Sequence, residues 1–229
     1  MDNAASSGAP ARVWCVVVAA GSGRRFGAPK QFAELGGSTV LGHSVTTAAQ
    51  ACDGVVVVVP ADEVEACRAM VPGADVVVSG GSTRSESSRA GVEAVPDEAE
   101  VILVHDGARP LATPGLFTRV TAAVDGGADG AVPVVPLADT IRDREGTLVD
   151  RDNLVAIQTP QGFVAATLRD AVRGGGEATD DAALVAEAGG TVEFVDGESA
   201  NRKVTTPEDL VIAQALMQRA GLQAERGGN

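Results

Sequence analysis

Residues 13–31 read VWCVVVAAGSGRRFGAPKQ, and this stretch decides the expected fold. Its first six residues are apolar at every position, which is typical of a strand buried on both faces of a parallel sheet. A glycine-rich turn follows directly, where an open α/β sheet places its ligand crevice. Glycines let the backbone turn sharply and present N–H groups to a phosphate. The stretch therefore predicts a buried strand that ends at an anion-binding turn.

Strand and helix signals alternate along the first half of the chain. Runs that are apolar throughout predict further buried strands, and apolar residues at helical spacing predict helices between them. The expected strands are 55–59, 76–78 and 101–104, and the expected helices are 40–51, 61–70 and 83–94. Repeated in this order, they indicate an α/β domain with a Rossmann-like layered sheet.

The pattern breaks after about residue 132. Residues 141–149 predict a β-hairpin with its turn around Glu145-Gly146. Two strands of mixed polarity are marginal alone, so this hairpin needs a surface to pack against. The elements expected after it are helices at 165–173 and 180–188, a strand at 191–195, and a last helix with Thr206 as N-cap and Pro207 in its first turn.

These elements indicate one folded domain. With 229 residues, the chain can bury a sizeable core without disulfides or a structural metal. The expected organisation is a flexible N-terminus at 1–12, a single domain at 13–220 with a protruding hairpin arm at about 134–156, and a frayed tail at 221–229.

Composition and charge exclude several classes of protein. A formal net charge of −13 opposes a nucleic-acid or anionic-membrane surface, and five Phe, one Trp and no Tyr are too few for base stacking. The longest apolar run, about 13–20, is too short to cross a membrane. Cys15, Cys52 and Cys67 lack CxxC spacing and predict free thiols in a reducing compartment. Because residues 1–12 show no signal-peptide pattern, we expect a cytoplasmic protein.

Cations follow the first glycine-rich turn. Arg24, Arg25 and Lys30 lie within seven residues and could recruit a polyphosphate, with charges that strengthen as a phosphoryl transition state develops. A dinucleotide fingerprint would need glycine where Phe26 stands, and the phosphate loop GxxxxGK[ST] is absent. The alternative is a solvated basic loop on a glycine turn.

A second glycine-rich segment, GGSTRSESSR at 80–89, follows the strand expected at 76–78. Two glycines and then hydroxyls at a helix start favour a pocket for an anion or a base. Simple capping of the helix by Ser82 or Thr83 explains the same residues equally well.

A third motif, HDGARP at 105–110, ends the strand expected at 101–104. A carboxylate at this place, Asp106, can hold Mg²⁺ or orient a hydroxyl, and Arg109 can hold a phosphate or fix Asp106. The alternative is a structural Asp–Arg pair, and a lone histidine such as His105 is more often structural. No Ser/His/Asp set and no Cys/His metal spacing occurs elsewhere.

Residue patterns alone therefore reach an α/β enzyme that handles a phosphorylated ligand. Shorter polar groups predict only caps or turns; these are Asp139-Thr140, Asp150-Arg151, 159–161, 179–181 and 201–205.

Five segments together carry a family resemblance. In chain order they are AAGSGRRFGAPKQF, HDGARP, DRDNLVAIQTPQGF, ATDDA and NRKVTTPEDL. From about residue 13 to residue 218, the sequence resembles the 2-C-methyl-D-erythritol 4-phosphate cytidylyltransferases of the non-mevalonate isoprenoid pathway. The resemblance implies a GT-A-like nucleotidyltransferase fold. It also implies transfer of CMP from CTP to the methylerythritol phosphate, with release of pyrophosphate and a requirement for Mg²⁺.

The resemblance assigns roles by position. Catalytic roles fall on Arg25, Lys30, Arg151 and Lys203. Contacts to CTP fall on Ala19, Ala20, Gly21, Gly23, Arg25, Lys30, Gly81, Ser87, Asp106 and Gly107. Contacts to the acceptor fall on Asp106, Arg109, Thr140, Arg151, Thr179 and Lys203. Asp106 is the candidate metal ligand, with Mg²⁺ held mainly by the CTP phosphates. The resemblance also implies a homodimer with interlocking arms, in which Arg151 serves the partner subunit's site.

Two departures and three alternatives accompany the resemblance. The loop between Phe26 and Lys30 and the hairpin turn at 144–146 are both short, and the second should alter the reach of the arm. A ribitol 5-phosphate cytidylyltransferase would share the nucleotide motifs and differ at the acceptor end. A nucleotide-binding regulator would bind without turnover, and a nicotinamide oxidoreductase is disfavoured by Phe26. The acceptor phosphate is already an anion, so no general base is expected.

Overall fold

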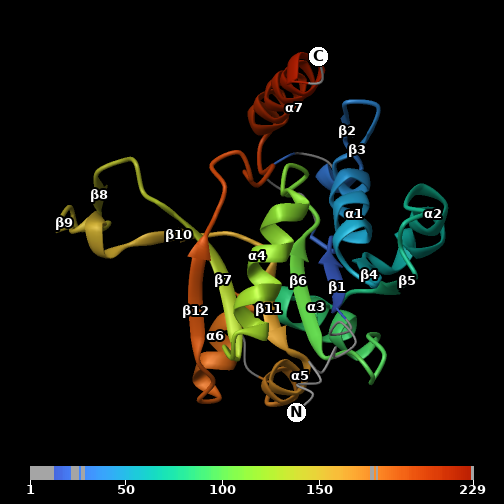
Figure 1. The fold of residues 1–229 in the computed structure, drawn as a ribbon, viewed down its shortest axis with the longest axis vertical. Coiled ribbons are helices and arrows are strands. Elements are labelled where there is room, and N and C mark those ends of the chain that lie inside the picture. The colour runs from blue at the N-terminus through green and yellow to red at the C-terminus, as the bar shows by residue number, and fades with distance from the viewer. Residues whose placement is uncertain (1–12, 22–25, 27–28, 176–177, 179, 228–229) are drawn as a thin grey trace, which may run out of the picture.

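The computed structural model describes residues 13–21, 26, 29–175, 178 and 180–227. An eight-stranded mixed sheet forms the centre of this part of the chain (Figure 1). Seven of its strands follow the order β10-β7-β11-β6-β1-β4-β5, and the eighth, β12, also pairs with β7. Its strands are β1 (Val13–Val18), β4 (Gly54–Val59), β5 (Val76–Ser79), β6 (Val101–Asp106), β7 (Gly130–Pro136), β10 (Val155–Ile157), β11 (Gln161–Val164) and β12 (Val192–Asp196). The α/β class and the layered sheet expected from the sequence are confirmed.

Helices cover both faces of the sheet, except α7 (Pro207–Gly227), which lies beyond its end (Figure 1). The others are α1 (Val40–Ala51), α2 (Val64–Met70), α3 (Arg84–Glu93), α4 (Pro114–Asp125), α5 (Ala165–Arg173) and α6 (Asp181–Glu187). In Figure 1, α1 and α4 lie in front of the sheet, whereas α3, α5 and α6 lie behind it. The short pairs β2 (Glu34–Leu35) with β3 (Ser38–Thr39) and β8 (Ile141–Arg142) with β9 (Leu148–Val149) stand outside this sheet.

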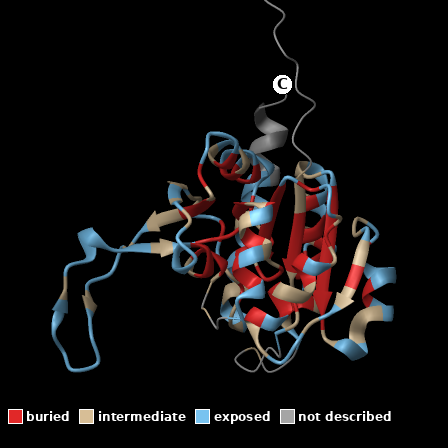
Figure 2. Cartoon of the chain, turned by 90° about the horizontal axis from the view of Figure 1, so that it is seen from below, coloured by how far each residue is buried: buried red, intermediate tan, exposed pale blue. Residues whose placement is uncertain are grey.

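The central strand β1 is buried on both faces, as its apolar run predicts. It pairs in parallel with β4 and β6, with Val16 opposite Val56 and Val104. Val17 packs toward the core beneath α1 and α4, and Val16 packs toward the core beneath α3 and α5. Figure 2 shows these strands as the buried centre of the molecule. Each fully buried valine contributes roughly 1.5 kcal/mol, so this strand is a firm support for the turn after it.

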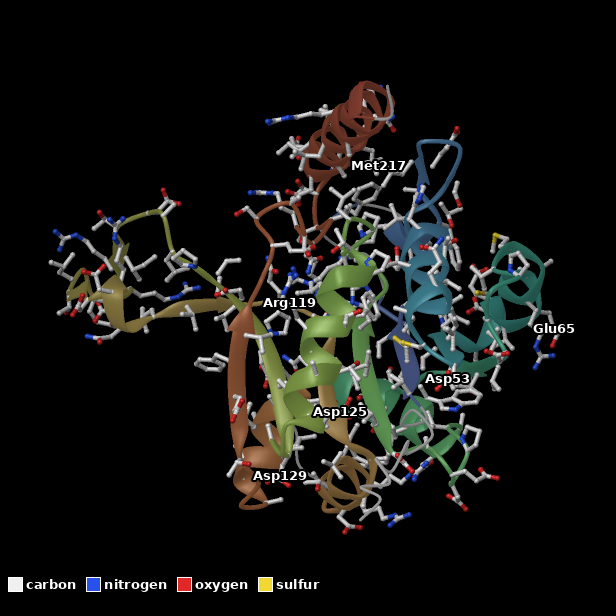
Figure 3. The ribbon with its side chains drawn as sticks, viewed as in Figure 1. Asp53, Glu65, Arg119, Asp125, Asp129 and Met217 are labelled. Carbon is white, nitrogen blue, oxygen red and sulfur yellow. The ribbon has the colours of Figure 1, made fainter. Side chains whose placement is uncertain are left out.

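Parallel pairing also sets which ends meet. β1 and β6 end in register, with Val18 opposite Asp106, and β4 pairs with β5 up to Val59 opposite Ser79. The three glycine-containing motifs therefore lie together at the carboxyl ends of these strands, as expected for an open α/β sheet. We call this side of the sheet the site edge. Asp53, which accepts a hydrogen bond from the Val13 nitrogen at 2.8 Å, marks the opposite edge (Figure 3).

The last helix, α7, packs above the site edge through a small apolar cluster. Leu35, Val40, Val204 and Ala213 are its buried members, and Met217 of α7 lies beside the β2–β3 pair (Figure 3). Thr206 caps the helix, because its Oγ1 accepts from the Asp209 nitrogen at 3.4 Å.

The end of α7 differs from the frayed tail expected from residue 221, because the helix continues to Gly227. Residues 222–226 read LQAER, which are good helix formers, and this accounts for the extension. Across the described residues, no helix has the length and apolar character that a membrane span needs.

The expected hairpin is present and protrudes from the body (Figure 1, Figure 2). Ile141 pairs with Val149, and Arg142 pairs with Leu148. Gly146 closes the turn with φ +90°, a conformation that favours glycine. Leu148 is 61% exposed, so the arm presents apolar side chains outside the body.

Candidate active site

A cavity of about 500 Å³ opens at the site edge of the sheet, at the ends of β1 and β6. Residues from the three glycine-containing motifs and from the segment before α7 line it. They are Val18, Ala19, Ala20, Gly21, Lys30, Gln31, Gly81, Ser82, Thr83, Arg84, Ser87, Asp106, Ala108, Lys203 and Thr205. The three motifs thus line one cavity, although Ala19 of the first and Ala108 of the third are far apart in the sequence.

The turn after β1 is held from two sides. The Ala19 nitrogen donates to the Val58 carbonyl at 2.7 Å, and the Gly107 nitrogen donates to the Val18 carbonyl at 2.9 Å. A Cβ at Gly107 would lie 3.0 Å from the Ala19 side chain and 3.3 Å from the Val18 oxygen, so glycine permits this close approach. The backbone is therefore held at Val18 and Ala19, where the chain enters the turn.

The start of α3 forms a second wall of the cavity. Its residues both cap the helix and line the cavity. Thr83 caps the helix in a full capping box with Glu86. Glu86 Oε2 also accepts from the Ser82 nitrogen and hydroxyl, each at 2.6 Å, and these bonds lower the pKa of Glu86. Ser87 Oγ accepts from the Gly81 nitrogen at 3.2 Å. The residues that cap the helix thus also form a cavity wall of small, polar side chains. None of the described residues that line the cavity is aromatic.

Asp106 and Lys203 form an ion pair inside the cavity, with 2.5 Å between Oδ2 and Nζ. Burial raises the pKa of Asp106, but the Lys203 ammonium outweighs burial and holds the pKa below its ordinary value. Lys30 lies on the same cavity and donates from Nζ to the Val204 carbonyl at 2.8 Å. Two ammonium groups and one carboxylate therefore face the same hollow.

His105 lies behind this cavity and is fully buried. Burial is the main cause that lowers its pKa to about 4, so the imidazole is neutral at neutral pH. Its ring packs against Phe117 with centroids 5.2 Å apart.

Arg109 is not among the described residues that line the cavity. Its guanidinium donates to the Asn201 carbonyl at 2.8 Å and to the Ile157 carbonyl at 3.3 Å. Burial lowers the pKa of Arg109, and the Asp106 charge opposes that shift. In this structure Arg109 ties the HDGARP loop to two neighbouring segments.

The two arm residues lie away from the cavity of their own chain. Thr140 and Arg151 are exposed, and the Arg151 guanidinium donates to the Ala138 carbonyl within the arm. Gly23, Arg25 and Thr179, which the resemblance also selected, lie outside the described residues, as does Arg24.

The structure adds polar side chains that sequence reasoning did not select, among them Arg84 and Gln31. Arg84 lines the cavity and forms an ion pair with Asp181, whose side chain is fully buried, at 2.7 Å. Burial lowers the pKa of Arg84, but Asp181 more than offsets this and raises it overall. Gln31 lines the cavity while 3% exposed, and its Nε2 has no hydrogen-bond partner among the described residues. The adjacent Lys30 was the only available signal for Gln31.

Comparison with known proteins agrees with this geometry. A family model described as 2-C-methyl-D-erythritol 4-phosphate cytidylyltransferase matches residues 13–219. A protein of that name from Rhodococcus opacus is 47% identical over 216 residues, which cover 90% of this chain and 95% of the relative.

Solved structures are similar over almost the whole chain. The 4-diphosphocytidyl-2C-methyl-D-erythritol synthase of Anaerococcus prevotii is 27% identical with a TM-score of 0.79, covering 91% of this chain and 96% of that one. The 2-C-methyl-D-erythritol 4-phosphate cytidylyltransferase of Thermus thermophilus is 37% identical with a TM-score of 0.74, covering 89% and 98%. The chain belongs to the 2-C-methyl-D-erythritol 4-phosphate cytidylyltransferase family.

Proposed function

We propose that this enzyme transfers the cytidylyl group of CTP to 2-C-methyl-D-erythritol 4-phosphate, giving 4-diphosphocytidyl-2-C-methyl-D-erythritol and pyrophosphate in isoprenoid precursor synthesis. Membership of the family supports this reaction. The structural observation that carries it is the cavity that unites the Ala19–Gly21 turn, the Gly81–Ser87 wall and the Lys30 and Lys203 ammonium groups. A triphosphate needs such cations, and a pyrimidine suits the small hydrogen-bonding wall.

The reaction is an in-line displacement. An oxygen of the acceptor phosphate attacks the α-phosphorus of CTP, the bond to the β-phosphate oxygen breaks, and pyrophosphate leaves. Because the nucleophile is already ionised, the site needs no general base, and His105 is not required for proton transfer. Lys30 stabilises negative charge that grows on the attacked phosphate, and Lys203 holds the acceptor phosphate near Asp106. Alignment of the two phosphates supplies a further part of the rate.

The residues of the cavity suit Mg²⁺. Asp106 pairs with Lys203 through Oδ2 and is the one carboxylate among the described residues that line the cavity. Mg²⁺ in nucleotide sites is usually held by one or two carboxylates together with substrate phosphates. Asp106 would be its protein ligand, and the ion would neutralise charge on the triphosphate when bound.

We further propose that the active enzyme is a homodimer with interlocking arms. The protruding hairpin, with Leu148 61% exposed, supports a partner surface over the arm. Thr140 and Arg151 lie outside the cavity of their own chain, which is the arrangement expected if they serve the partner subunit. Arg25, Gly23 and Thr179 keep the roles that the family assigns by position. A cytoplasmic location is consistent with three free cysteines.

The test is pyrophosphate release from CTP and Mg²⁺ with a panel of polyol phosphates. We expect 2-C-methyl-D-erythritol 4-phosphate to give the highest kcat/KM, and CTP to exceed ATP and GTP. A higher kcat/KM with ribitol 5-phosphate would show that ribitol 5-phosphate is the acceptor. Binding of CTP without turnover on any acceptor would show a nucleotide-binding protein without this activity. Comparable kcat/KM for ATP and CTP would contradict the cytidylyl assignment.

A further inference from the structure

Directly behind the cavity, His105 and Thr159 form a buried pair that the proposed reaction does not use. His105 is fully buried and Thr159 is 7% exposed, and neither lines the cavity. The His105 Nδ1 and the Thr159 hydroxyl lie 3.0 Å apart. His105 belongs to β6 and Thr159 to the segment between β10 and β11, so the pair joins two neighbouring parts of the sheet.

The surrounding atoms favour one tautomer of the ring. His105 Nε2 lies 3.3 Å from the Arg109 carbonyl oxygen, which can only accept, so this contact favours a hydrogen on Nε2. A neutral imidazole then has a bare Nδ1, which accepts the proton of the Thr159 hydroxyl. The Thr159 oxygen in turn accepts from the Asp106 nitrogen at 2.9 Å. The order of donation is therefore Asp106 N–H to Thr159, Thr159 to His105, and His105 to Arg109.

This chain of hydrogen bonds begins and ends on the backbone of one loop. Its donor end is the backbone of Asp106, and its acceptor end is the backbone of Arg109, so the loop of residues 106–109 is held at both limits. The cavity residues Asp106 and Ala108 lie on this loop. From this backbone position the Asp106 carboxylate meets Lys203 at 2.5 Å.

The segment that carries Lys203 is tied to the same pair. Asn201 Nδ2 donates to the Thr159 carbonyl at 2.8 Å, and Arg109 donates to the Asn201 carbonyl at 2.8 Å. Asn201 is fully buried and precedes Lys203 by two residues. Thr159 thus bonds directly to the Asp106 backbone and, through the Asn201 side chain, to the segment that carries Lys203.

We propose that His105 and Thr159 are positioning residues, and that the hydrogen bond from the Thr159 hydroxyl to the Nε2–H tautomer of His105 sets the Asp106–Lys203 pair for turnover. The inference rests on the proposed function of that pair. If the two side chains only filled the core, their volumes alone would matter. The chain of hydrogen bonds, in contrast, requires the Thr159 hydroxyl and one tautomer of His105. The two roles therefore separate under substitutions that keep volume and change hydrogen bonding.

The first measurement is the tautomer, and it does not depend on activity. Nitrogen-15 NMR of the full chain at pH 7 separates protonated from bare ring nitrogens, and the protein has only two histidines to assign. We expect His105 to be protonated at Nε2 and bare at Nδ1. In Thr159→Val the Nδ1 resonance of His105 should move, while His43, bonded to the Leu35 carbonyl at 2.6 Å, should not. Protonation of wild-type His105 at Nδ1 overturns the proposal.

The second measurement is turnover in two variants, one that keeps the volume of Thr159 and one that keeps its hydroxyl. Thr159→Val keeps volume and removes the hydroxyl, and we expect kcat to fall about 10–100-fold while KM for CTP changes less than about threefold. Thr159→Ser keeps the hydroxyl and should retain kcat within about threefold. Thr118→Val on the exposed side of α4 is the matched control, expected to match wild type.

The remaining outcomes decide the matter. Unchanged kcat in folded Thr159→Val, equal losses in the valine and serine variants, or a rise in KM alone would each overturn the positioning role. Circular dichroism melting establishes which variants fold, and Thr159→Ala replaces the valine variant if valine is not accommodated. Inactivity of the wild-type enzyme with every acceptor would instead contradict the proposed function, and the tautomer result would still stand on its own.

Discussion

At the scale of single residues, Lys30 is where the proposed chemistry can be tested most directly. Its ammonium lies on the cavity beside the glycine-rich turn and donates to the Val204 carbonyl. We expect Lys30→Ala to lower kcat on the order of 10²–10³-fold, because charge on the attacked phosphate grows in the transition state. Steady-state pyrophosphate release gives kcat, and calorimetry gives CTP affinity. A variant that loses only CTP affinity and turns over normally when saturated would make Lys30 a binding residue alone.

His105 makes stability depend on pH. Its pKa is lowered to about 4 by burial, against an ordinary value of 6.5. As pH falls below 6.5 the unfolded chain binds this proton first, so stability decreases until about pH 4 and His105 adds nothing further below that. The expected loss is about 3 kcal/mol between pH 7 and pH 4. Urea unfolding across that range should show a shallower decline in His105→Gln than in wild type; equal slopes would mean that the imidazole charges in the folded state.

The sequence predicted cavity residues well where they directly follow strands. Ala19 and Asp106 come after apolar runs whose parallel pairing brings their ends together. Arg84 and Gln31 could not be selected in this way, because the direction of each side chain depends on distant parts of the chain. Arg84 is held by Asp181, about a hundred residues away, and no local pattern reports that contact.

At the scale of elements, the start of α3 is bonded to the first residue of α6 and to Ala178 before it. Arg84 pairs with Asp181 at 2.7 Å, Ser88 donates to Asp181 at 2.6 Å, and Ser85 exchanges hydrogen bonds with the backbone of Ala178. The cavity wall at the start of α3 is thereby joined to Ala178 and to the start of α6. The central carboxylate of this junction is fully buried.

This junction gives a stability prediction. Asp181→Ala leaves Arg84 and Ser88 without their shared acceptor, and we expect a loss of about 3 kcal/mol, the low end for a broken buried pair because Arg84 is 34% exposed. The matched control is Asp170→Ala, which breaks an exposed pair with Arg173 and should cost less than about 0.5 kcal/mol. Urea unfolding at pH 7 measures both. Equal losses in the two variants would show that the buried junction contributes no more than a surface pair.

The elements that local patterns missed have physical reasons. β7 carries Pro133 and Pro136, which disfavour a strand, yet pairing with β10 and β12 imposes one. β10 and β11 run antiparallel to their neighbours and are short, at three and four residues, so they give weak local signals. Helix α4 did have a usable signal, since Thr113 caps it and Pro114 opens it. The break noted after residue 132 thus corresponds to the change from parallel to mixed pairing.

At the scale of the whole molecule, the arm and the cavity lie in different places on one chain. The arm extends to the left of the sheet in Figure 1, while the cavity lies at the ends of β1 and β6. Arg151 therefore needs a second chain to meet Lys30, if both serve one reaction. A hairpin of mixed polarity also needs a partner surface to be stable, so the same dimer would satisfy both requirements.

Mixing two inactive variants tests this arrangement. If Arg151 serves the partner subunit, a heterodimer of Lys30→Ala and Arg151→Ala has one site with both defects and one site with neither. Random exchange makes about half of the dimers heterodimers, each with one intact site of two, so about a quarter of wild-type activity should return when the sites are independent. If Arg151 acts within its own chain, every site carries one defect and no activity returns. The measurement is pyrophosphate release after co-refolding equal amounts of the two variants, with each variant refolded alone as control. Differential tags confirm that heterodimers have formed, and absence of recovery in that mixture would place Arg151 in the site of its own chain.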